Sequence, residues 1–213
     1  MIKDVRYNRM GERNGEILSE LSSRKVKPTV IDVGASYNPW AAEWITATVD
    51  LNDVPLKDTI QFRGDITNII VWENVLNYVA ENGKFDYCIC THTLEDISSP
   101  ILVATMLSRI AKEGFVGVPS KYVESRHNGG PCRGWLHHRW IFNNEDDIIV
   151  AYPKLPFTEY LKCLQEISNS FHETNEELSF CWEDTCDIKA VNGDFFPSDN
   201  FAIQIYNNLL DKK

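Results

Sequence analysis

Residues 29–36 read Thr-Val-Ile-Asp-Val-Gly-Ala-Ser, a short apolar run that ends in an acid and a glycine. The run follows Pro28 and is rich in β-branched residues, which predicts a buried strand over 29–34. Gly34 has no Cβ, so the backbone of the turn can approach a ligand closely. The stretch therefore predicts a strand whose carboxyl end lies at a binding site.

Strand-like and helix-like patterns alternate along the rest of the chain. Strands are predicted at 47–53, just before 64, and at 85–92, 115–120, 178–184 and 200–207, and helices at 15–25, 67–83, 99–114 and 160–171. Such alternation predicts an α/β fold, a Rossmann-like doubly wound sheet with helices on both faces. Ligands of these sheets bind outside the carboxyl ends of the strands.

Composition narrows the class of protein. The chain has 213 residues, of which 43% are hydrophobic and 24% charged, which predicts one globular domain over 1–213. The net charge of −10 disfavours a nucleic-acid partner. No apolar run approaches the roughly 18 residues of a membrane span, and no secretory signal begins the chain, so we expect a soluble, cytoplasmic protein. Six cysteines without a CxxC pair predict reduced thiols.

Acidic residues end the next two strands. Asp50 closes the second strand, and its carboxylate could accept both hydroxyls of a ribose. Asp65 follows the third strand and could accept a hydrogen bond from an adenine amine. Ser36 and Asn38 stand where a dinucleotide-binding turn has glycines, which disfavours a nicotinamide or flavin cofactor. Taken singly, Asp50 and Asp65 also suit ordinary turns.

Four motifs in succession carry a family resemblance. DVGAS (32–36), VDLN (49–52), GDI (64–66) and FDYCICTHTLED (85–96) resemble, in order and spacing, the motifs of class I S-adenosylmethionine-dependent methyltransferases, in particular their small-molecule and sugar O-methyltransferase branch. The resemblance covers 28–120. It implies a seven-stranded sheet whose last strand is antiparallel, with S-adenosylmethionine as cofactor and S-adenosylhomocysteine as product.

The resemblance also implies which residues contact the cofactor. The implied contacts are Asp32, Gly34, Ala35, Ser36, Asp50, Leu51, Asp65, Ile66, Thr91 and His92. Asp32 could equally orient the turn without touching the ligand. The chain departs from the family pattern in two ways, because its first turn has few glycines and Asp96 replaces the usual histidine.

The segment 121–142 is predicted to be the substrate loop, because it follows the fifth strand and should emerge beside the reactive end of the cofactor. Methyl transfer to a hydroxyl requires removal of a proton, for which histidine is suited. We therefore predict His138 or His137 as the general base, with His92 as a further candidate. Acceptor binding is predicted for Glu124, Arg126, Trp135, Arg139 and Trp140. The histidines could instead pack the loop onto the sheet.

No metal site is predicted, although two alternatives stay open. His127, Cys132 and His137 are evenly spaced by five residues, which matches no common zinc motif. Asp96 and Glu124 could together hold a divalent magnesium ion.

These observations favour methyl transfer from S-adenosylmethionine to a hydroxyl of a sugar or glycan. The loop more faintly resembles methyltransferase domains joined to glycosyltransferases, including those of large DNA viruses, and the resemblance implies that this chain could be part of a larger glycan-modifying protein. A small-molecule or protein methyltransferase is the alternative within the class. A catalytically silent binding domain of the same fold is the alternative outside it.

Overall fold

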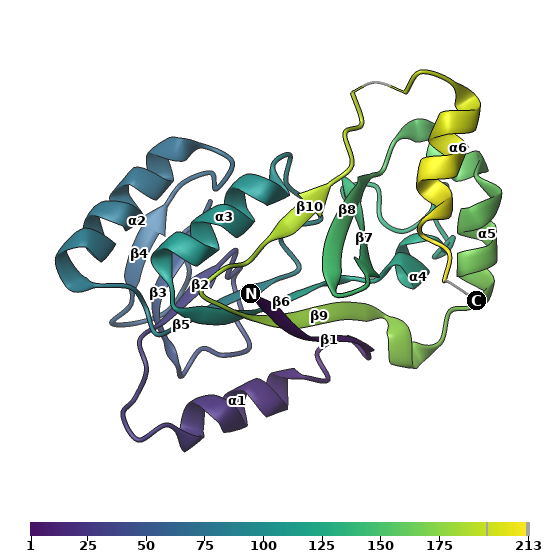
Figure 1. Cartoon of the computed structure of the whole chain (residues 1–213). Helices are drawn as coiled ribbons and strands as arrows, with labels where there is room; N and C mark the ends of the chain where they lie inside the picture. The colour runs from purple at the N-terminus through teal and green to yellow at the C-terminus, as the bar shows by residue number, and fades with distance from the viewer. Residues whose placement is uncertain (195, 212–213) are drawn as a thin grey trace.

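A seven-stranded sheet forms the centre of the computed structural model, which describes residues 1–194 and 196–211 (Figure 1). The strand order is β1-β9-β6-β5-β2-β3-β4. The strands are β1 (Ile2–Asn8), β2 (Val30–Val33), β3 (Ile45–Asp50), β4 (Ile60–Arg63), β5 (Tyr87–Thr91), β6 (Glu113–Pro119) and β9 (Glu177–Glu183). Strands β2 to β6 are parallel, whereas β9 is antiparallel to β6. The predicted doubly wound, Rossmann-like sheet with a late antiparallel strand is confirmed.

Helices cover both faces of the sheet, as predicted (Figure 1). Helices α2 (Ile69–Asn82) and α3 (Pro100–Ile110) lie on one face, and α1 (Asn14–Ser23) lies on the other. Side chains alternate along β5: Cys88 and Cys90 pack in the core that holds α2 and α3, whereas Ile89 packs in the core that holds α1. Both faces of the central strands are therefore buried, which explains their continuous apolar sequences.

The seventh strand comes from the N-terminus rather than from 200–207, where the sequence pattern predicted it. Strand β1 pairs antiparallel with β9 at the edge of the sheet. The segment predicted as a strand is instead helix α6 (Asp199–Asn207), capped by the Ser198 side chain. Ala202 and Tyr206, four residues apart, are its buried residues, whereas Phe201 and Ile203 are exposed. The buried spacing is that of a helix, so the strand prediction was wrong.

The helix predicted over 99–114 is shorter than expected. It ends at Ile110, and β6 already begins at Glu113, so Gly114 lies within a strand and does not stop the helix. A Cβ on Gly114 would lie 2.4 Å from the carbonyl oxygen of Cys88. Glycine is needed here because two neighbouring strands approach closely.

The chain also forms a second, three-stranded sheet of order β10-β8-β7. Its strands are β7 (Trp140–Glu145), β8 (Ile148–Pro153) and β10 (Ile188–Ala190), and it packs with α6, the short helix α4 (Lys121–Glu124) and α5 (Lys162–Asn169). Single 3-10 turns occupy Pro156–Tyr160 and Glu173–Asn175. The predicted loop over 121–142 thus contains α4 and the start of β7. Its last residues lead into a hairpin that the sequence pattern did not predict.

Two further expectations bear on the class of protein. The six cysteines are free thiols. Among the helices that the structure describes, none is both long and apolar enough to cross a membrane.

Candidate functional site

The carboxyl ends of β2, β3 and β4 and the turn after β5 enclose a cavity of about 290 Å³. It lies beside β2, where the strand order of the sheet reverses, which is the usual ligand position in such folds. We call it the strand-end cavity. It is lined by Gly34, Asp50, Leu51, Asp65, Ile66, His92, Thr93, Asp96 and Ile97. The fold therefore gathers residues from all four sequence motifs.

Gly34 forms the turn after β2, where a side chain would be both strained and crowded. Its φ is +80°, a conformation that favours glycine. A Cβ at this position would lie 2.2 Å from the hydroxyl oxygen of Thr93, which leaves no room for one. The Gly34 backbone, in the turn after β2, therefore packs directly against the Thr93 side chain, in the turn after β5. Gly34 also forms part of the cavity wall.

The two carboxylates of the cavity are held by short loops. Asp50 accepts hydrogen bonds from the backbone amides of Ser36, at 3.0 Å, and Asn52, at 2.8 Å. Asp65 accepts from the hydroxyl and the backbone amide of Thr67. These two bonds lower the pKa of Asp65 below its usual value, so the carboxylate is charged at neutral pH. Both groups are fixed in place and keep free lone pairs for a ligand.

Four of the predicted cofactor residues do not line the strand-end cavity. They are Asp32, Ala35, Ser36 and Thr91. Asp32 is buried within β2, where burial and then the charge of Asp50 raise its pKa to about 8. Ser36 adopts a φ of +56° and affects the cavity indirectly, because its backbone amide donates a hydrogen bond to Asp50.

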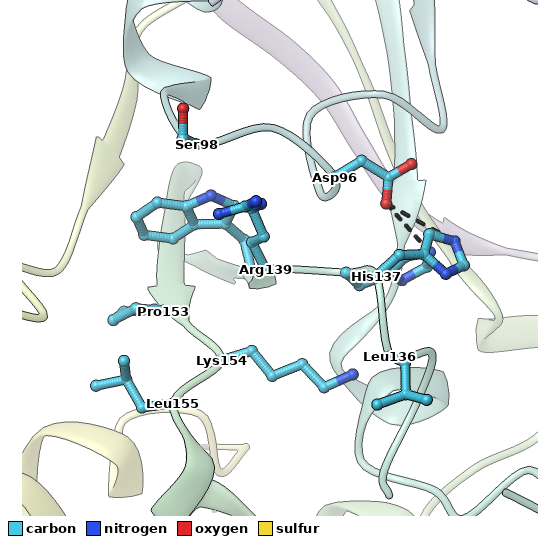
Figure 2. Close-up of a pocket in the computed structure, with 10 residues that line it drawn as sticks. Asp96, Ser98, Leu136, His137, Arg139, Pro153, Lys154 and Leu155 are labelled. Carbon is cyan, nitrogen blue, oxygen red and sulfur yellow. Dashed lines mark ion pairs between the residues drawn. The ribbon is translucent and has the colours of Figure 1, made fainter.

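A second cavity, of about 700 Å³, shares Asp96 with the first. It lies between the turn after β5, residues 136–140 and the end of β8, and we call it the hairpin cavity. Figure 2 shows Asp96 and His137 close to each other on one side of it, with the Lys154 side chain extended from the end of β8. Its lining residues are Asp96, Ser98, Leu136, His137, His138, Arg139, Trp140, Pro153, Lys154 and Leu155.

His138 is held in the hairpin cavity by a buried acid. Its Nδ1 lies 2.7 Å from Oε1 of Glu124, which is fully buried on the short helix α4. The second oxygen of Glu124 accepts a hydrogen bond from Lys154 Nζ at 2.9 Å, and the Trp135 ring lies 4.9 Å from the His138 ring. Glu124 and Trp135 therefore orient His138 from behind and do not line the cavity.

Asp96 faces both loop histidines. Its Oδ1 lies 3.7 Å from Nε2 of His138 and 3.9 Å from Nε2 of His137. This oxygen is buried and accepts no hydrogen bond from the described residues. His138 has a side chain only 8% exposed, whereas that of His137 is 65% exposed. The three groups converge where the two cavities meet.

His92 lies between two carboxylates in the wall of the strand-end cavity. Its Nε2 is 3.2 Å from Glu177 and its Nδ1 is 3.6 Å from Glu95. Burial opposes the charged ring, but these two acids outweigh it and raise the pKa of His92 to about 9. Glu177 on β9 also accepts from Asn8 and from the Gly11 amide. The N-terminal segment therefore supports the cavity through Glu177, which the sequence reading missed.

Other sequence expectations fall outside both cavities. Arg126 lies 3.7 Å above the ring of Phe171 and lines neither cavity. Within residues 1–194 and 196–211, His127 and Cys132 are not gathered with His137 into one group of ligands. Asp96 lies with the two loop histidines, whereas Glu124 contacts His138 and Lys154.

The residues contributed by the second sheet were also missed. Lys154 and Leu155 line the hairpin cavity because the β7–β8 hairpin brings the end of β8 beside Trp140. The sequence held a signal for this hairpin, because Asp146 and Asp147 stand together between two apolar runs. In the structure both residues have positive φ and form a two-residue turn. Such turns are typical of tight hairpins.

Comparisons with known proteins concern the fold. No protein-family model and no curated protein matches the sequence. The N-terminal domain of EvdMO1, crystallised in the presence of SAH and D-fucose, is similar at 8% identity over 81% of this chain and 82% of that chain, with a TM-score of 0.43. A protein from Pyrococcus horikoshii is similar at 10% identity over 82% of this chain and 90% of that chain, with a TM-score of 0.47. A SAM-dependent methyltransferase from Thermotoga maritima is similar at 17% identity over 49% of this chain and 52% of that chain, with a TM-score of 0.32.

Proposed function

We propose that this protein transfers a methyl group from S-adenosylmethionine to a hydroxyl of a sugar or glycan. The observation that carries the proposal is the meeting of two cavities at Asp96, one lined by strand-end carboxylates and the other by the paired histidines. A transferase needs this arrangement, because donor and acceptor must be held side by side for an in-line displacement.

The strand-end cavity suits S-adenosylmethionine. In the proposed pose, Asp50 accepts hydrogen bonds from the ribose hydroxyls, and Asp65 and Ile66 contact the adenine. The methionine end then runs past the Gly34 backbone toward Asp96. Asp50, Asp65 and Asp96 line the cavity together, and their negative charge favours a sulfonium cation over a phosphate-bearing cofactor.

His138 is the proposed general base. The acceptor oxygen attacks the methyl carbon, the carbon–sulfur bond breaks with its electrons on sulfur, and the hydroxyl proton passes to Nε2 of His138. Glu124 at Nδ1 orients the ring and stabilises the imidazolium that forms. His92 is less suited, because a pKa of about 9 keeps its ring protonated at neutral pH. His137 is more exposed and less firmly held.

The hairpin cavity suits a hydroxyl-rich ligand. Trp140, Leu136 and Leu155 offer apolar surface for one face of a sugar ring. Ser98, Arg139 and Lys154 offer hydrogen bonds on the other sides. The chain as a whole carries a net charge of −10, which opposes a polyphosphate acceptor.

The test follows the methyl group. The protein is incubated with labelled S-adenosylmethionine and matched panels of glycosides, catechols, peptides and RNA, and label is expected in a glycoside. His138→Ala should lower turnover by at least about 10²-fold with little change in cofactor affinity. His127→Ala, at an exposed position outside both cavities, is the control. Label in peptide or RNA alone overturns the sugar acceptor, and no binding of S-adenosylmethionine overturns the whole proposal.

A further inference from the structure

Three metal-binding side chains converge where the two cavities meet. Asp96, His137 and His138 each present one ligand atom, and these atoms lie within 4.8 Å of one another. No other group of three or more such side chains gathers within residues 1–194 and 196–211. The cluster joins residues 41 positions apart in the sequence through the fold alone.

The spacing of the ligand atoms fits one ion. Zinc binds imidazole nitrogen and carboxylate oxygen at roughly 2.0–2.2 Å, so tetrahedral ligand atoms lie roughly 3.3–3.5 Å apart. The Asp96 oxygen is 3.7 Å from His138 Nε2 and 3.9 Å from His137 Nε2. All three ligand atoms lie within 4.8 Å of one another, so closing the set requires the 65% exposed His137 ring to move inward by up to about an ångström.

The surroundings of the cluster are those of a metal centre. His138 presents Nε2 to the cluster while its Nδ1 faces the buried Glu124, and an acid behind a histidine is the usual second partner of a metal ligand. Lys154 balances the charge of Glu124. The buried Oδ1 of Asp96 accepts no hydrogen bond from the described part of the chain, which is costly for a carboxylate oxygen unless a ligand binds it.

The donor set selects the kind of metal. Two imidazoles and one carboxylate suit zinc and its neighbours, whereas magnesium and calcium prefer oxygen ligands. The three side chains leave further coordination positions open toward the hairpin cavity. A small ligand such as water can fill them.

We infer that Asp96, His137 and His138 form a site for a divalent transition-metal ion of the zinc type. The consequence for catalysis rests on the proposed function. An ion on Nε2 of His138 takes the lone pair that would accept the hydroxyl proton. Metal occupancy therefore blocks histidine-assisted methyl transfer, and removal of the ion restores it.

Binding is tested first, without cofactor or acceptor. Protein dialysed against a chelator is titrated with Zn²⁺ and separately with Mg²⁺ by calorimetry, and one saturable Zn²⁺ site is expected with much weaker Mg²⁺ binding. His137→Ala, at an exposed position that the fold tolerates, should weaken Zn²⁺ binding at least about tenfold, and Asp96→Asn likewise. His127→Ala and Asp187→Asn are matched controls outside the cluster. Absent saturation, or affinity unchanged in His137→Ala and Asp96→Asn, overturns the site.

Methyl transfer is then measured with Zn²⁺ and with chelator. Lower turnover in Zn²⁺ than in chelator, with the inhibition constant raised in His137→Ala, supports the inference. Stimulation by Zn²⁺ overturns the blocking role, because the ion would then replace the base. If no methyl transfer occurs under either condition, the proposed function fails, and the calorimetric result still decides whether the metal site exists.

Discussion

The Asp50 carboxylate joins the two loops that flank the strand-end cavity. It accepts from the amides of Ser36 and Asn52, so it both shapes the turn after β2 and faces the cavity. We expect Asp50→Ala to weaken S-adenosylmethionine binding by about 1–3 kcal/mol, because ribose hydrogen bonds to a charged acceptor are lost. Calorimetry measures the change. Asp53→Ala, an exposed acid three residues away that pairs with Arg63, should bind as wild type. Equal affinity of Asp50→Ala and wild type would contradict the assignment.

A comparison of Gly34 with Gly83 separates the cost of backbone strain from the cost of a side-chain clash. Gly34 and Gly83 both have positive φ, of +80° and +84°, but only Gly34 has a side chain where its Cβ would lie. Gly83→Ala should lose about 1–3 kcal/mol of unfolding free energy through backbone strain alone, because φ +84° with ψ 169° is essentially restricted to glycine. Gly34→Ala should lose more, because the clash with Thr93 adds to the strain. Urea unfolding of both variants tests this. Equal losses would show that Thr93 moves aside without cost.

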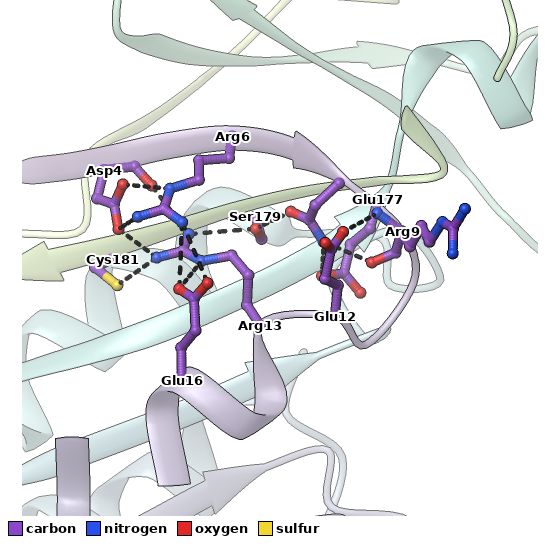
Figure 3. Close-up of polar contacts among 10 residues, drawn as sticks. Asp4, Arg6, Arg9, Glu12, Arg13, Glu16, Glu177, Ser179 and Cys181 are labelled. Atoms are coloured by element: carbon purple, nitrogen blue, oxygen red, sulfur yellow. Dashed lines mark hydrogen bonds and ion pairs between the residues drawn. The ribbon is translucent and has the colours of Figure 1, made fainter. Parts of the chain in front are cut away.

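At the scale of elements, Arg13 attaches the edge strand to the sheet. Its side chain is 3% exposed and contacts Asp4 on β1 and Ser179 on β9 (Figure 3). Its guanidinium also lies 5.3 Å from the centre of the Phe115 ring. The polar contacts compensate a charge that would otherwise be buried without a partner. Arg13, the N-cap residue of α1, therefore adds side-chain contacts to the backbone pairing that holds β1 at the edge of the sheet.

Replacing Arg13 should loosen that edge. We expect Arg13→Ala to lower the free energy of unfolding by about 2 kcal/mol, because a cavity forms beside Phe115 and the Asp4 carboxylate keeps only Arg6 as its partner. The control is Arg9→Ala, an exposed arginine paired with Glu173, for which a change of less than about 0.5 kcal/mol is expected. Denaturant unfolding measures both. A loss confined to Arg9→Ala, or equal in the two variants, would refute this account of the edge.

Across the whole molecule, His92 links three distant parts of the chain. It lies in the turn after β5, Glu177 belongs to β9, and Asn8 and Gly11 from the N-terminal segment hold Glu177 in place. His92 is the member of this link that lines the strand-end cavity, so the same residue joins these parts of the fold and shapes the cavity.

The link predicts a pH dependence. The folded pKa of His92, about 9, lies above its unfolded value near 6.5. The charged ring therefore contributes stability that is complete below about pH 6.5 and is lost as the pH rises through about 9. Thermal unfolding of the wild type should show this decline between pH 7 and 10, and His92→Asn should flatten it. Parallel profiles of the two proteins would show that the ion pairs contribute nothing.

The sequence by itself determined the central part of the fold and most of the strand-end cavity. Strands β2, β3 and β5 and helix α2 follow from local patterns, because apolar runs, the Asn68 cap and the Gly83 stop act within a few residues. Gly34, Asp50 and Asp65 could be placed together without a structure, since parallel strands bring their carboxyl ends to one edge.

Only the tertiary structure decided the rest. Strand β1 forms because it pairs with residues 177–183 of β9. The apolar pattern at 200–207 fits the periods of both a strand and a helix. The Ser198 cap and the hydrogen bond that the Tyr206 hydroxyl donates to the Pro153 carbonyl favour the helix. The pairing of Glu124 with His138 and the meeting of Asp96 with both histidines also join segments distant in sequence. These contacts depend on how the second sheet packs against the first, and no local sequence pattern encodes the distance between segments that lie far apart in the chain.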